Sequence, residues 1–417
     1  MKKIIALLLL FAMALTLVSC DSDGDGADGQ DAPSFSSVEP SGDSEDSLAF
    51  EKDVAVTESK NVHLKFYTDQ GTNLVRIRVS DGNDVYEIDV KAVAKDVLGL
   101  NGGALSDDAE FRFFTKDINF DGFGDFAVQA FKKNGDTVPY LCWFWDNGEA
   151  EYVFGAELES PMFDPVNSRI YCNVSENGED YISVYSAADG KILFSESVSV
   201  SQNVSFMSDL SGYEEFMAPA ERDSYLVLVN YENTLDENYV PGDLTDVTNT
   251  RLDGRATQQM RYTAAMALEA LYIEMNAAGY NDVSVTSAYR PYDYQSQLFN
   301  GYIDQEMAEN GYTYEEAYNI VKTYSAIPGT SEHQTGLCCD MHNLGAADQA
   351  FANQPAYEWL KDNAWKFGFI LRFPENKEDI TQITFEPWHY RFVGRYHAAR
   401  IHAMGLCLEE YLALINN

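Results

Sequence analysis

The spacing of apolar residues changes once along this chain, and that change limits the folds open to it. Within residues 61–205, apolar and polar residues alternate in short runs such as 62–67, 74–79 and 85–90. Alternation with a period of two places every second side chain on one face of a strand. Asp-Gly and Gly-Asn turns separate the runs. Residues 61–205 are therefore predicted to form an all-β domain.

The pattern breaks around 201–223 and then becomes mixed. Residues 256–278 have helical spacing and end at Gly279, and Thr313–Glu316 has the form of a capping box. A further helix is predicted over 359–367, before Gly368. Short strands are predicted at 225–230, 283–287, 369–372 and 383–386. Residues 225–417 are thus predicted to be a separate domain that contains both helices and strands.

The first residues have the features of an export signal. Two lysines are followed by an apolar run to Val18, and small residues then precede Cys20. This resembles a bacterial lipoprotein signal over residues 1–20, in which Cys20 receives the lipid; an ordinary signal peptide is the alternative. The Asp/Ser/Gly-rich residues 21–60 are predicted to be a disordered tether. The mature protein would then be anchored to the outer face of the cytoplasmic membrane.

The formal net charge is −39 over 417 residues. Such an excess of carboxylates repels phosphate, so neither nucleic acid nor an anionic lipid surface is expected to be a direct partner.

A polar loop at 117–125 reads Asp-Ile-Asn-Phe-Asp-Gly-Phe-Gly-Asp. Hard cations such as Ca²⁺ bind several oxygens on a flexible loop, and Gly122 permits a sharp turn. The flanking residues have strand character, so the loop resembles those of integrin-type β-repeat domains rather than an EF-hand. We predict a possible calcium site; a polar turn without metal is the alternative. Its ligands would be Asp117, Asn119, Asp121 and Asp125.

Two stretches near the C-terminus carry the groups needed for metal chemistry. Residues 328–340 contain His333 and Asp340, and residues 384–391 contain Glu386 three positions before His389. Two imidazoles and one carboxylate, with one position left open, form the usual ligand set of a catalytic zinc site. Glu386 remains available to move a proton.

These stretches resemble the D-alanyl-D-alanine carboxypeptidases of the vancomycin-resistance branch, in peptidase family M15. The family motifs are Ser-x-His followed by Asp, and later Glu-x-x-His, and the likeness runs from about 225 to 417. The resemblance implies an α+β fold, similar to hedgehog proteins, with a small antiparallel sheet and helices. It also implies one catalytic Zn²⁺.

The family likeness further implies roles for residues around the metal. Glu386 would be the acid/base and Arg290 a second catalytic residue that holds a carboxylate or an oxyanion. The residues expected to contact substrate are Ser331, Gln295, Trp388, Tyr390 and Arg391. Cys338 and Cys339 stand where the family has small apolar residues, and we expect them to be small and buried. Ligation of zinc by one of these thiols is the alternative.

The sequence therefore predicts a zinc D,D-carboxypeptidase that removes terminal D-alanine from the peptide stems of peptidoglycan. Three alternatives remain: an L,D-carboxypeptidase acting on tetrapeptide stems, an endopeptidase that cuts cross-links, and a lipoprotein that binds metal and cell wall without catalysis. The intact Glu386 argues against the last of these.

Overall fold

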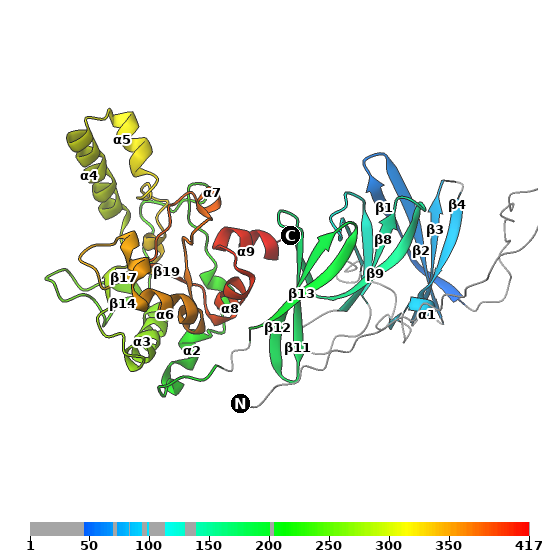
Figure 1. The fold of residues 1–417 in the computed structure, drawn as a ribbon, viewed down its shortest axis with the longest axis horizontal. Coiled ribbons are helices and arrows are strands. Elements are labelled where there is room, and N and C mark those ends of the chain that lie inside the picture. The colour runs from blue at the N-terminus through cyan, green and yellow to red at the C-terminus, as the bar shows by residue number, and fades with distance from the viewer. Residues whose placement is uncertain are drawn as a thin grey trace, which may run out of the picture. The chain divides into compact units, whose positions relative to one another are not determined.

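The computed structural model describes residues 46–69, 73–82, 84–93, 98–99, 113–129, 139–200 and 204–416. Its N-terminal part is built from antiparallel sheets, and its C-terminal part combines helices with a small sheet (Figure 1). The predictions for Cys20 and for residues 1–45 lie outside the described residues.

The first sheet has the strand order β1-β2-β3-β4, with β5 paired to β3. β2 follows the predicted alternation, because Val62, Leu64 and Phe66 are buried while their neighbours are more exposed. β1 begins at Asp46, inside the segment predicted to be a tether. It pairs with β2 and buries Val54 and Val56, so residues 46–57 are an ordered strand and not part of a disordered tether. The elements are β1 (Asp46–Thr57), β2 (Lys60–Asp69), β3 (Asn73–Asp81), β4 (Asp84–Asp89), α1 (Val90–Val93) and β5 (Leu98–Gly99).

Two more four-stranded sheets follow, with the orders β6-β7-β8-β9 and β10-β11-β12-β13. Both faces of β8 are buried, and successive side chains enter two different cores: Trp143 joins one cluster and Cys142 the other. The elements are β6 (Phe113–Lys116), β7 (Asp125–Gln129), β8 (Pro139–Asp146), β9 (Glu151–Glu159), β10 (Pro161–Asp164), β11 (Arg169–Glu176), β12 (Glu179–Ala188) and β13 (Lys191–Ser199).

The C-terminal part holds the antiparallel sheet β16-β17-β19-β18 and the two-stranded sheet β14-β15. A core of apolar residues from α3, α6 and this sheet lies on one side of β17. α4 and α5 form a hairpin that projects from this part (Figure 1), and the predicted capping box of α5 is present at Thr313. The strands are β14 (Leu244–Asp246), β15 (Gln259–Arg261), β16 (Ser284–Ser287), β17 (Cys338–His342), β18 (Phe369–Leu371) and β19 (His389–Phe392). The helices are α2 (Glu214–Met217), α3 (Tyr262–Ala277), α4 (Tyr292–Asn310), α5 (Tyr314–Val321), α6 (Pro355–Asn363), α7 (Glu378–Thr381), α8 (Arg395–Met404) and α9 (Leu408–Ile415).

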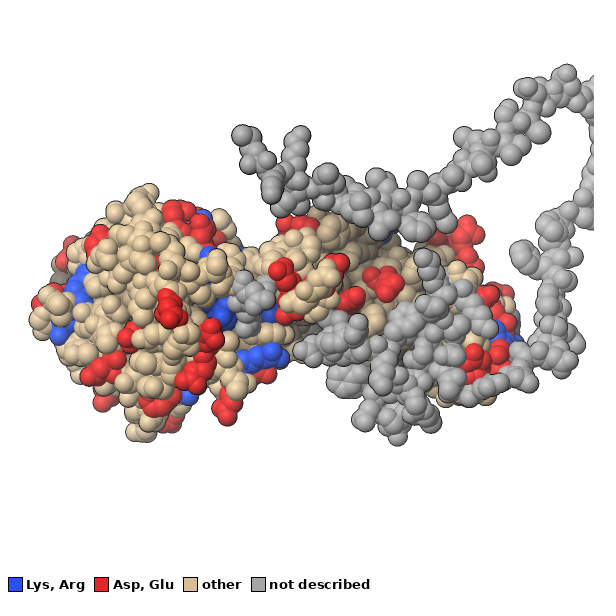
Figure 2. Space-filling view, turned by 90° about the horizontal axis from the view of Figure 1, so that it is seen from below, with Lys and Arg blue, Asp and Glu red and all other residues tan. Residues whose placement is uncertain are grey.

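Acidic side chains are spread over the described surface shown in Figure 2, with fewer basic ones between them. This agrees with the net charge of −39. Among the described residues, no helix has both the length and the apolar character needed to cross a bilayer.

Candidate active site

The site is built on two neighbouring antiparallel strands, β17 and β19. Asp340 of β17 stands directly opposite His389 of β19. Because side chains alternate along a strand, Cys338 and Asp340 share one face of β17, while Cys339 turns into the hydrophobic core on the other. The sheet thus brings together two predicted ligands that are 49 positions apart in sequence.

His333 reaches this face from a short 3-10 helix, Glu332–Thr335, that precedes β17. Its Nδ1 lies 2.6 Å from the carbonyl oxygen of Ala288, and its Nε2 lies 3.4 Å from Asp340 Oδ1. Since the carbonyl can only accept a hydrogen bond, Nδ1 carries the proton. The lone pair of Nε2 therefore points toward Asp340.

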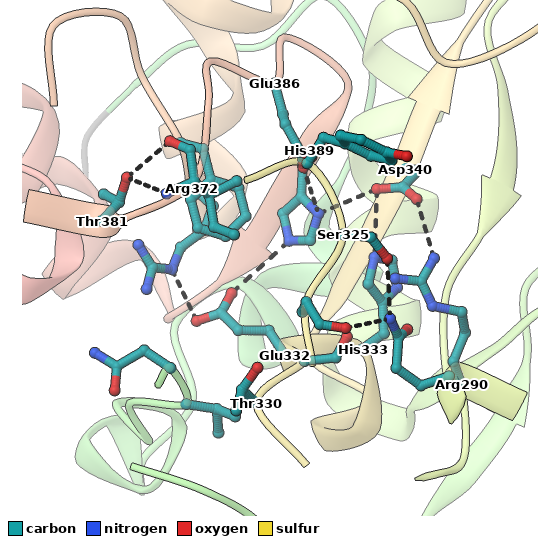
Figure 3. A pocket seen from close by; sticks show the side chains of 18 of the residues that line it. Arg290, Ser325, Thr330, Glu332, His333, Asp340, Arg372, Thr381, Glu386 and His389 are labelled. Atoms are coloured by element: carbon teal, nitrogen blue, oxygen red, sulfur yellow. Dashed lines mark hydrogen bonds and ion pairs between the residues drawn. The ribbon is translucent and has the colours of Figure 1, made fainter. Parts of the chain in front are cut away.

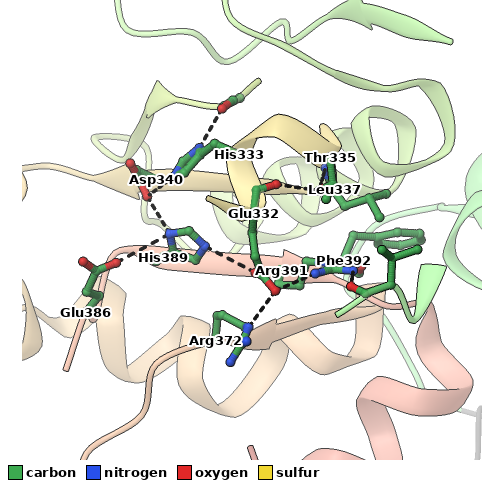
Figure 4. A network of polar contacts seen from close by, with 12 residues as sticks. Glu332, His333, Thr335, Leu337, Asp340, Arg372, Glu386, His389, Arg391 and Phe392 are labelled. Atoms are coloured by element: carbon green, nitrogen blue, oxygen red, sulfur yellow. Dashed lines mark hydrogen bonds and ion pairs between the residues drawn. The ribbon is translucent and has the colours of Figure 1, made fainter. Parts of the chain in front are cut away.

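His389 lies between Asp340 and Glu332 (Figure 4). Its Nδ1 is 3.1 Å from Asp340 Oδ1, and its Nε2 is 3.8 Å from Glu332 Oε2. Burial would raise the pKa of Asp340, but the two imidazoles outweigh it and hold that pKa well below its usual range. Among the described residues, Asp340 Oδ1, His389 Nε2 and Glu332 Oε2 are buried without a hydrogen-bond partner.

A divalent metal ion fits this arrangement. Two imidazoles and one carboxylate converge in a buried position, and an oxygen between them has no hydrogen bond to accept within the described residues. Buried polar atoms are rarely left unpaired, so each such case needs a partner. Zn²⁺ prefers this set of nitrogen and oxygen donors. The residues predicted as ligands therefore suit zinc.

Glu386 lies in the loop before β19 rather than in the predicted strand 383–386. Its backbone N–H donates to Phe373, and its Oε2 is 3.6 Å from His389 Nδ1. The side chain is 12% exposed. Burial raises the pKa of Glu386 to about 7 although the nearby His389 lowers it. A carboxyl group with a pKa near 7 can both accept and return a proton.

A cavity of about 340 Å³ opens above these groups. Four predicted residues line it besides the metal ligands and Glu386: Arg290, Gln295, Ser331 and Trp388. Asp340 lies between His389 and Arg290 (Figure 3), and Arg290 Nη1 is 3.8 Å from Asp340 Oδ2. A cavity of this size suits the end of a short peptide rather than a long segment.

A family model described as D-alanyl-D-alanine carboxypeptidase matches residues 257–395. A putative carboxypeptidase of Bacillus subtilis is 34% identical over 229 residues, covering 54% of this chain and 80% of the relative. A D-alanyl-D-alanine carboxypeptidase of Enterococcus faecalis is 37% identical over 196 residues, or 46% of this chain and 67% of the relative.

The chain belongs to the D-alanyl-D-alanine carboxypeptidase family.

Two solved structures have 36% sequence identity to the chain. One is an LD-carboxypeptidase, with a TM-score of 0.41 and coverage of 47% of this chain and 88% of that one. The other is a vancomycin-resistance D,D-pentapeptidase in complex with Zn(II), with a TM-score of 0.38 and coverage of 45% of this chain and 98% of that one.

Glu332 is a buried residue of the site that the sequence did not reveal. Its Oε1 accepts hydrogen bonds from Arg372 Nε at 2.8 Å and from Arg391 Nη1 at 2.6 Å. Glu409 holds the other end of Arg372 through two hydrogen bonds. Burial would raise the pKa of Glu332, but the two arginines outweigh it and lower that pKa. The signal available in the sequence was its position directly before His333 in the family motif.

Two residues predicted to contact substrate do not line the cavity. Arg391 is completely buried and donates to Glu332 and to the carbonyl oxygens of Tyr225 and Val227. Tyr390 points to the opposite face of β19 and joins the hydrophobic core. Residues 225–230 were predicted to form a strand, but the structure has no strand there. The carbonyl oxygens of Tyr225 and Val227, which could pair with a neighbouring strand, accept hydrogen bonds from Arg391 instead.

Cys338 is buried as expected, but it belongs to none of the hydrophobic clusters of the described residues. Its Sγ and one ring nitrogen each of His333 and His389 all lie within 4.8 Å of one another. Burial would raise the pKa of the Cys338 thiol, but the two imidazoles outweigh it and lower that pKa to about 6. The described cysteines are all free thiols.

The loop at 117–125 satisfies its own oxygens. Asp117 accepts from the backbone N–H groups of Asp121 and Gly122, and the amide of Asn119 donates to Asp121 and to the carbonyl of Gly190. Both oxygens of Asp125 also accept from backbone N–H groups. The prediction of calcium finds no support in this geometry.

Proposed function

We propose that this chain is a zinc-dependent D-alanyl-D-alanine carboxypeptidase that releases the last D-alanine from peptidoglycan stems. The observation that carries the proposal is the convergence of His333, Asp340 and His389 beside Glu386 in one cavity. The similarity to carboxypeptidases of the same family supports the choice of substrate.

His333, Asp340 and His389 would hold the zinc, which supplies Lewis acidity by polarising a carbonyl and acidifying water. Glu386 accepts the proton of the water molecule that adds to the scissile carbonyl. When the C–N bond breaks, Glu386 delivers this proton to the leaving amine of D-alanine. The pKa of about 7 suits both steps, because the proton is then neither held nor released too strongly.

Arg290 is placed to bind a negative charge on the substrate. It is the cationic side chain nearest to Asp340 in the cavity lining, and Ser287 Oγ accepts from its Nη1 at 3.1 Å. A guanidinium presents several donors in one plane, which matches the terminal carboxylate of a peptide stem. Gln295 is fixed by a hydrogen bond from its Nε2 to the carbonyl of Ala326, and its Oε1 has no partner among the described residues. Gln295 thus offers the substrate an acceptor.

The test measures the release of free D-alanine by mass spectrometry. The zinc-loaded protein is incubated separately with a pentapeptide stem that ends in D-Ala-D-Ala and with the corresponding tetrapeptide. Glu386→Gln should abolish release, whereas Glu358→Gln on the exposed side of α6 should not. Release from the pentapeptide alone is the expected result. Release from the tetrapeptide alone would make the enzyme an L,D-carboxypeptidase, and release from neither would overturn the proposal.

We also infer that the mature protein is attached to the outer face of the cytoplasmic membrane through a lipid on Cys20. The sequence around that residue is the support for this inference. A Cys20→Ala variant should lose the lipid mass and leave the membrane fraction. Retention of the variant in the membrane would contradict the anchor.

A further inference from the structure

Strand β16 carries a β-bulge beside the candidate active site. Val285 of β16 pairs with Met341 of β17. The next pair joins Ser287 to Asp340, so Thr286 is an extra residue in β16. In a regular ladder Thr286 would stand opposite Asp340, and Ser287 would lie on the other face, because side chains alternate along a strand. The bulge therefore turns Ser287 to the face of the sheet that carries Asp340.

The burial of β16 and its flanking residues shows the same change of face. Val283 and Val285 are buried in the main hydrophobic core, and unbroken alternation would place Ser287 there too. Ala288 joins that core instead. Ser287 is then available to Arg290, whose Nη1 donates to its Oγ at 3.1 Å. Arg290 lines the cavity of the candidate active site (Figure 3), so the bulge supplies an anchor for a cavity residue.

A chain of hydrogen bonds holds the extra residue of the bulge. Arg251 Nη2 lies 3.3 Å from Nδ1 of His342, and this nitrogen must accept because a guanidinium can only donate. The proton of the neutral imidazole is therefore on Nε2, which lies 3.2 Å from Thr286 Oγ1 and donates to it. The Thr286 hydroxyl then donates to the backbone carbonyl of Asp340 at 3.2 Å. The direction of every hydrogen bond in the chain is thus fixed.

The guanidinium end of this chain is itself fixed to the sheet. Arg251 Nε donates to Ser284 Oγ of β16 at 2.8 Å, and its Nη1 donates to the carbonyl of Leu344, just after β17, at 2.7 Å. His342 is 1% exposed, so its two hydrogen bonds are not exchanged freely with water. Side-chain hydrogen bonds thereby replace backbone pairing at the point where the bulge interrupts the ladder.

We propose that Thr286, held by His342 and Arg251, is a positioning residue that keeps Arg290 in place for the substrate. Among the described residues, Thr286 is not part of the cavity lining, so its effect reaches the substrate through Ser287 and Arg290. Without the Thr286 hydroxyl the bulge loses its support, and Arg290 loses its anchor. A planar guanidinium binds a carboxylate well only in one orientation. The inference rests on the proposed function, in which Arg290 binds the terminal carboxylate of the stem.

The closing experiment measures peptide binding by calorimetry. The zinc-loaded full chain carries Glu386→Gln, which prevents cleavage, and is titrated with a pentapeptide stem ending in D-Ala-D-Ala and with the C-terminal amide of the same peptide. Adding Thr286→Val, which keeps the shape of the side chain without its hydroxyl, should weaken binding of the carboxylate peptide about 10-fold, the usual worth of a hydrogen bond to a charged group. Binding of the amide should not change. Thr286→Ser should bind both peptides like the parent, and every variant should hold one zinc by elemental analysis.

Equal affinities of Thr286→Val and Thr286→Ser for the carboxylate peptide would overturn the inference. Loss of zinc in Thr286→Val, or an equal loss of amide binding, would also overturn it, because the effect would then not pass through Arg290. Ser287→Ala gives an independent check: it should weaken binding of the carboxylate peptide alone and add little to Thr286→Val, since both act on one guanidinium. Fully additive losses would contradict the shared route.

The inference and the proposed function can fail separately. If the binding pattern holds but the protein with Glu386 intact releases no D-alanine, the carboxypeptidase proposal fails and the positioning role remains. If D-alanine is released but the Thr286 variants bind alike, only the positioning role fails. If the parent binds neither peptide, both fail.

Discussion

Asp125 in the β-rich part and Asp340 in the α+β part are both buried aspartates, but different partners surround them. Asp125 accepts from the backbone N–H groups of Ile118, Asn119 and Trp145. Asp340 Oδ1 accepts no hydrogen bond within the described residues and faces a nitrogen of each of two histidines. The sequence analysis named both residues as candidate metal ligands, because both are carboxylates within polar motifs. The difference shows that unsatisfied lone pairs, rather than ligand types, decide which site suits a cation.

The two sites should differ most when one candidate ligand is removed from each. His333→Ala should lower zinc affinity by more than roughly 100-fold, because a direct ligand counts for more than the outer partners that contribute 10–100-fold. Release of D-alanine should fall with it. Asp121→Ala should change neither quantity. Both variants are checked by measuring their zinc content by elemental analysis and their release of D-alanine. Loss of zinc in Asp121→Ala would contradict the assignment of the zinc site to His333, Asp340 and His389.

Removing the metal should loosen one region and leave the other unchanged. At a free zinc concentration of 1,000 times the Kd, binding stabilises the folded state by about 4 kcal/mol. After chelation, hydrogen–deuterium exchange should rise in 332–342 and 389–392 but not in 117–129. Zinc should restore protection, and calcium should not. Faster exchange in 117–129 after chelation would show that the β-rich loop also holds a metal.

A finer test concerns how His389 is held. Glu332 Oε2 lies 3.8 Å from Nε2 of His389, while Nδ1 on the other edge of the ring faces Asp340. Glu332→Gln should lower zinc affinity by roughly 10–100-fold. Glu409→Gln is the matched control, because Glu409 binds the same Arg372 from the side away from the histidines. Equal zinc affinities in the two variants, measured by competition with a chromophoric chelator, would remove the role given to Glu332.

The sequence predicted the four residues that the structure brings together, His333, Asp340, Glu386 and His389, because their spacing is local to two short motifs. The prediction that Arg391 contacts substrate was wrong because Glu386 and His389, its neighbours in the motif, do line the cavity whereas Arg391 does not. What the motif cannot show is that Glu332 and the carbonyls of Tyr225 and Val227 bind that guanidinium from below. The contacts with Tyr225 and Val227 join residues more than 160 positions apart in the chain, and the contact with Glu332 joins residues 59 positions apart.

The strands, too, could be predicted where the pattern that marks them is local in the sequence. Strands with regular alternation, such as β2, were predicted well because burial on one face has a period of two. β1 was missed because residues 21–60 were treated as one acidic segment rich in Ser and Gly, and its pairing with β2 from Asp46 to Thr57 shows that it is a strand. Cys338 was read as apolar because the sequence cannot tell which of two adjacent cysteines faces the core.

The two aspartates should also differ in the sign of their pH dependence in the metal-free protein. Burial raises the pKa of Asp125 to about 7, so the folded state holds a proton that the unfolded state has released above about pH 4. The stability of the wild type relative to Asp125→Asn should therefore fall between pH 4 and 7. The pKa of Asp340 is lowered, so the wild type should gain over Asp340→Asn above about pH 4 and lose that gain as the pH falls.

The chain's own thiols can report the two regions separately. Cys142 lies in β8 and Cys339 in β17, and both are fully buried, so each becomes reactive only when its region unfolds. Urea midpoints for labelling by a pyridyl disulfide, which reacts in acid, are measured at several pH values for the wild type and both variants. Slopes of opposite sign at Cys142 and Cys339 are expected. Slopes of the same sign would mean that the N–H groups around Asp125 stabilise its charge as strongly as the histidines stabilise that of Asp340.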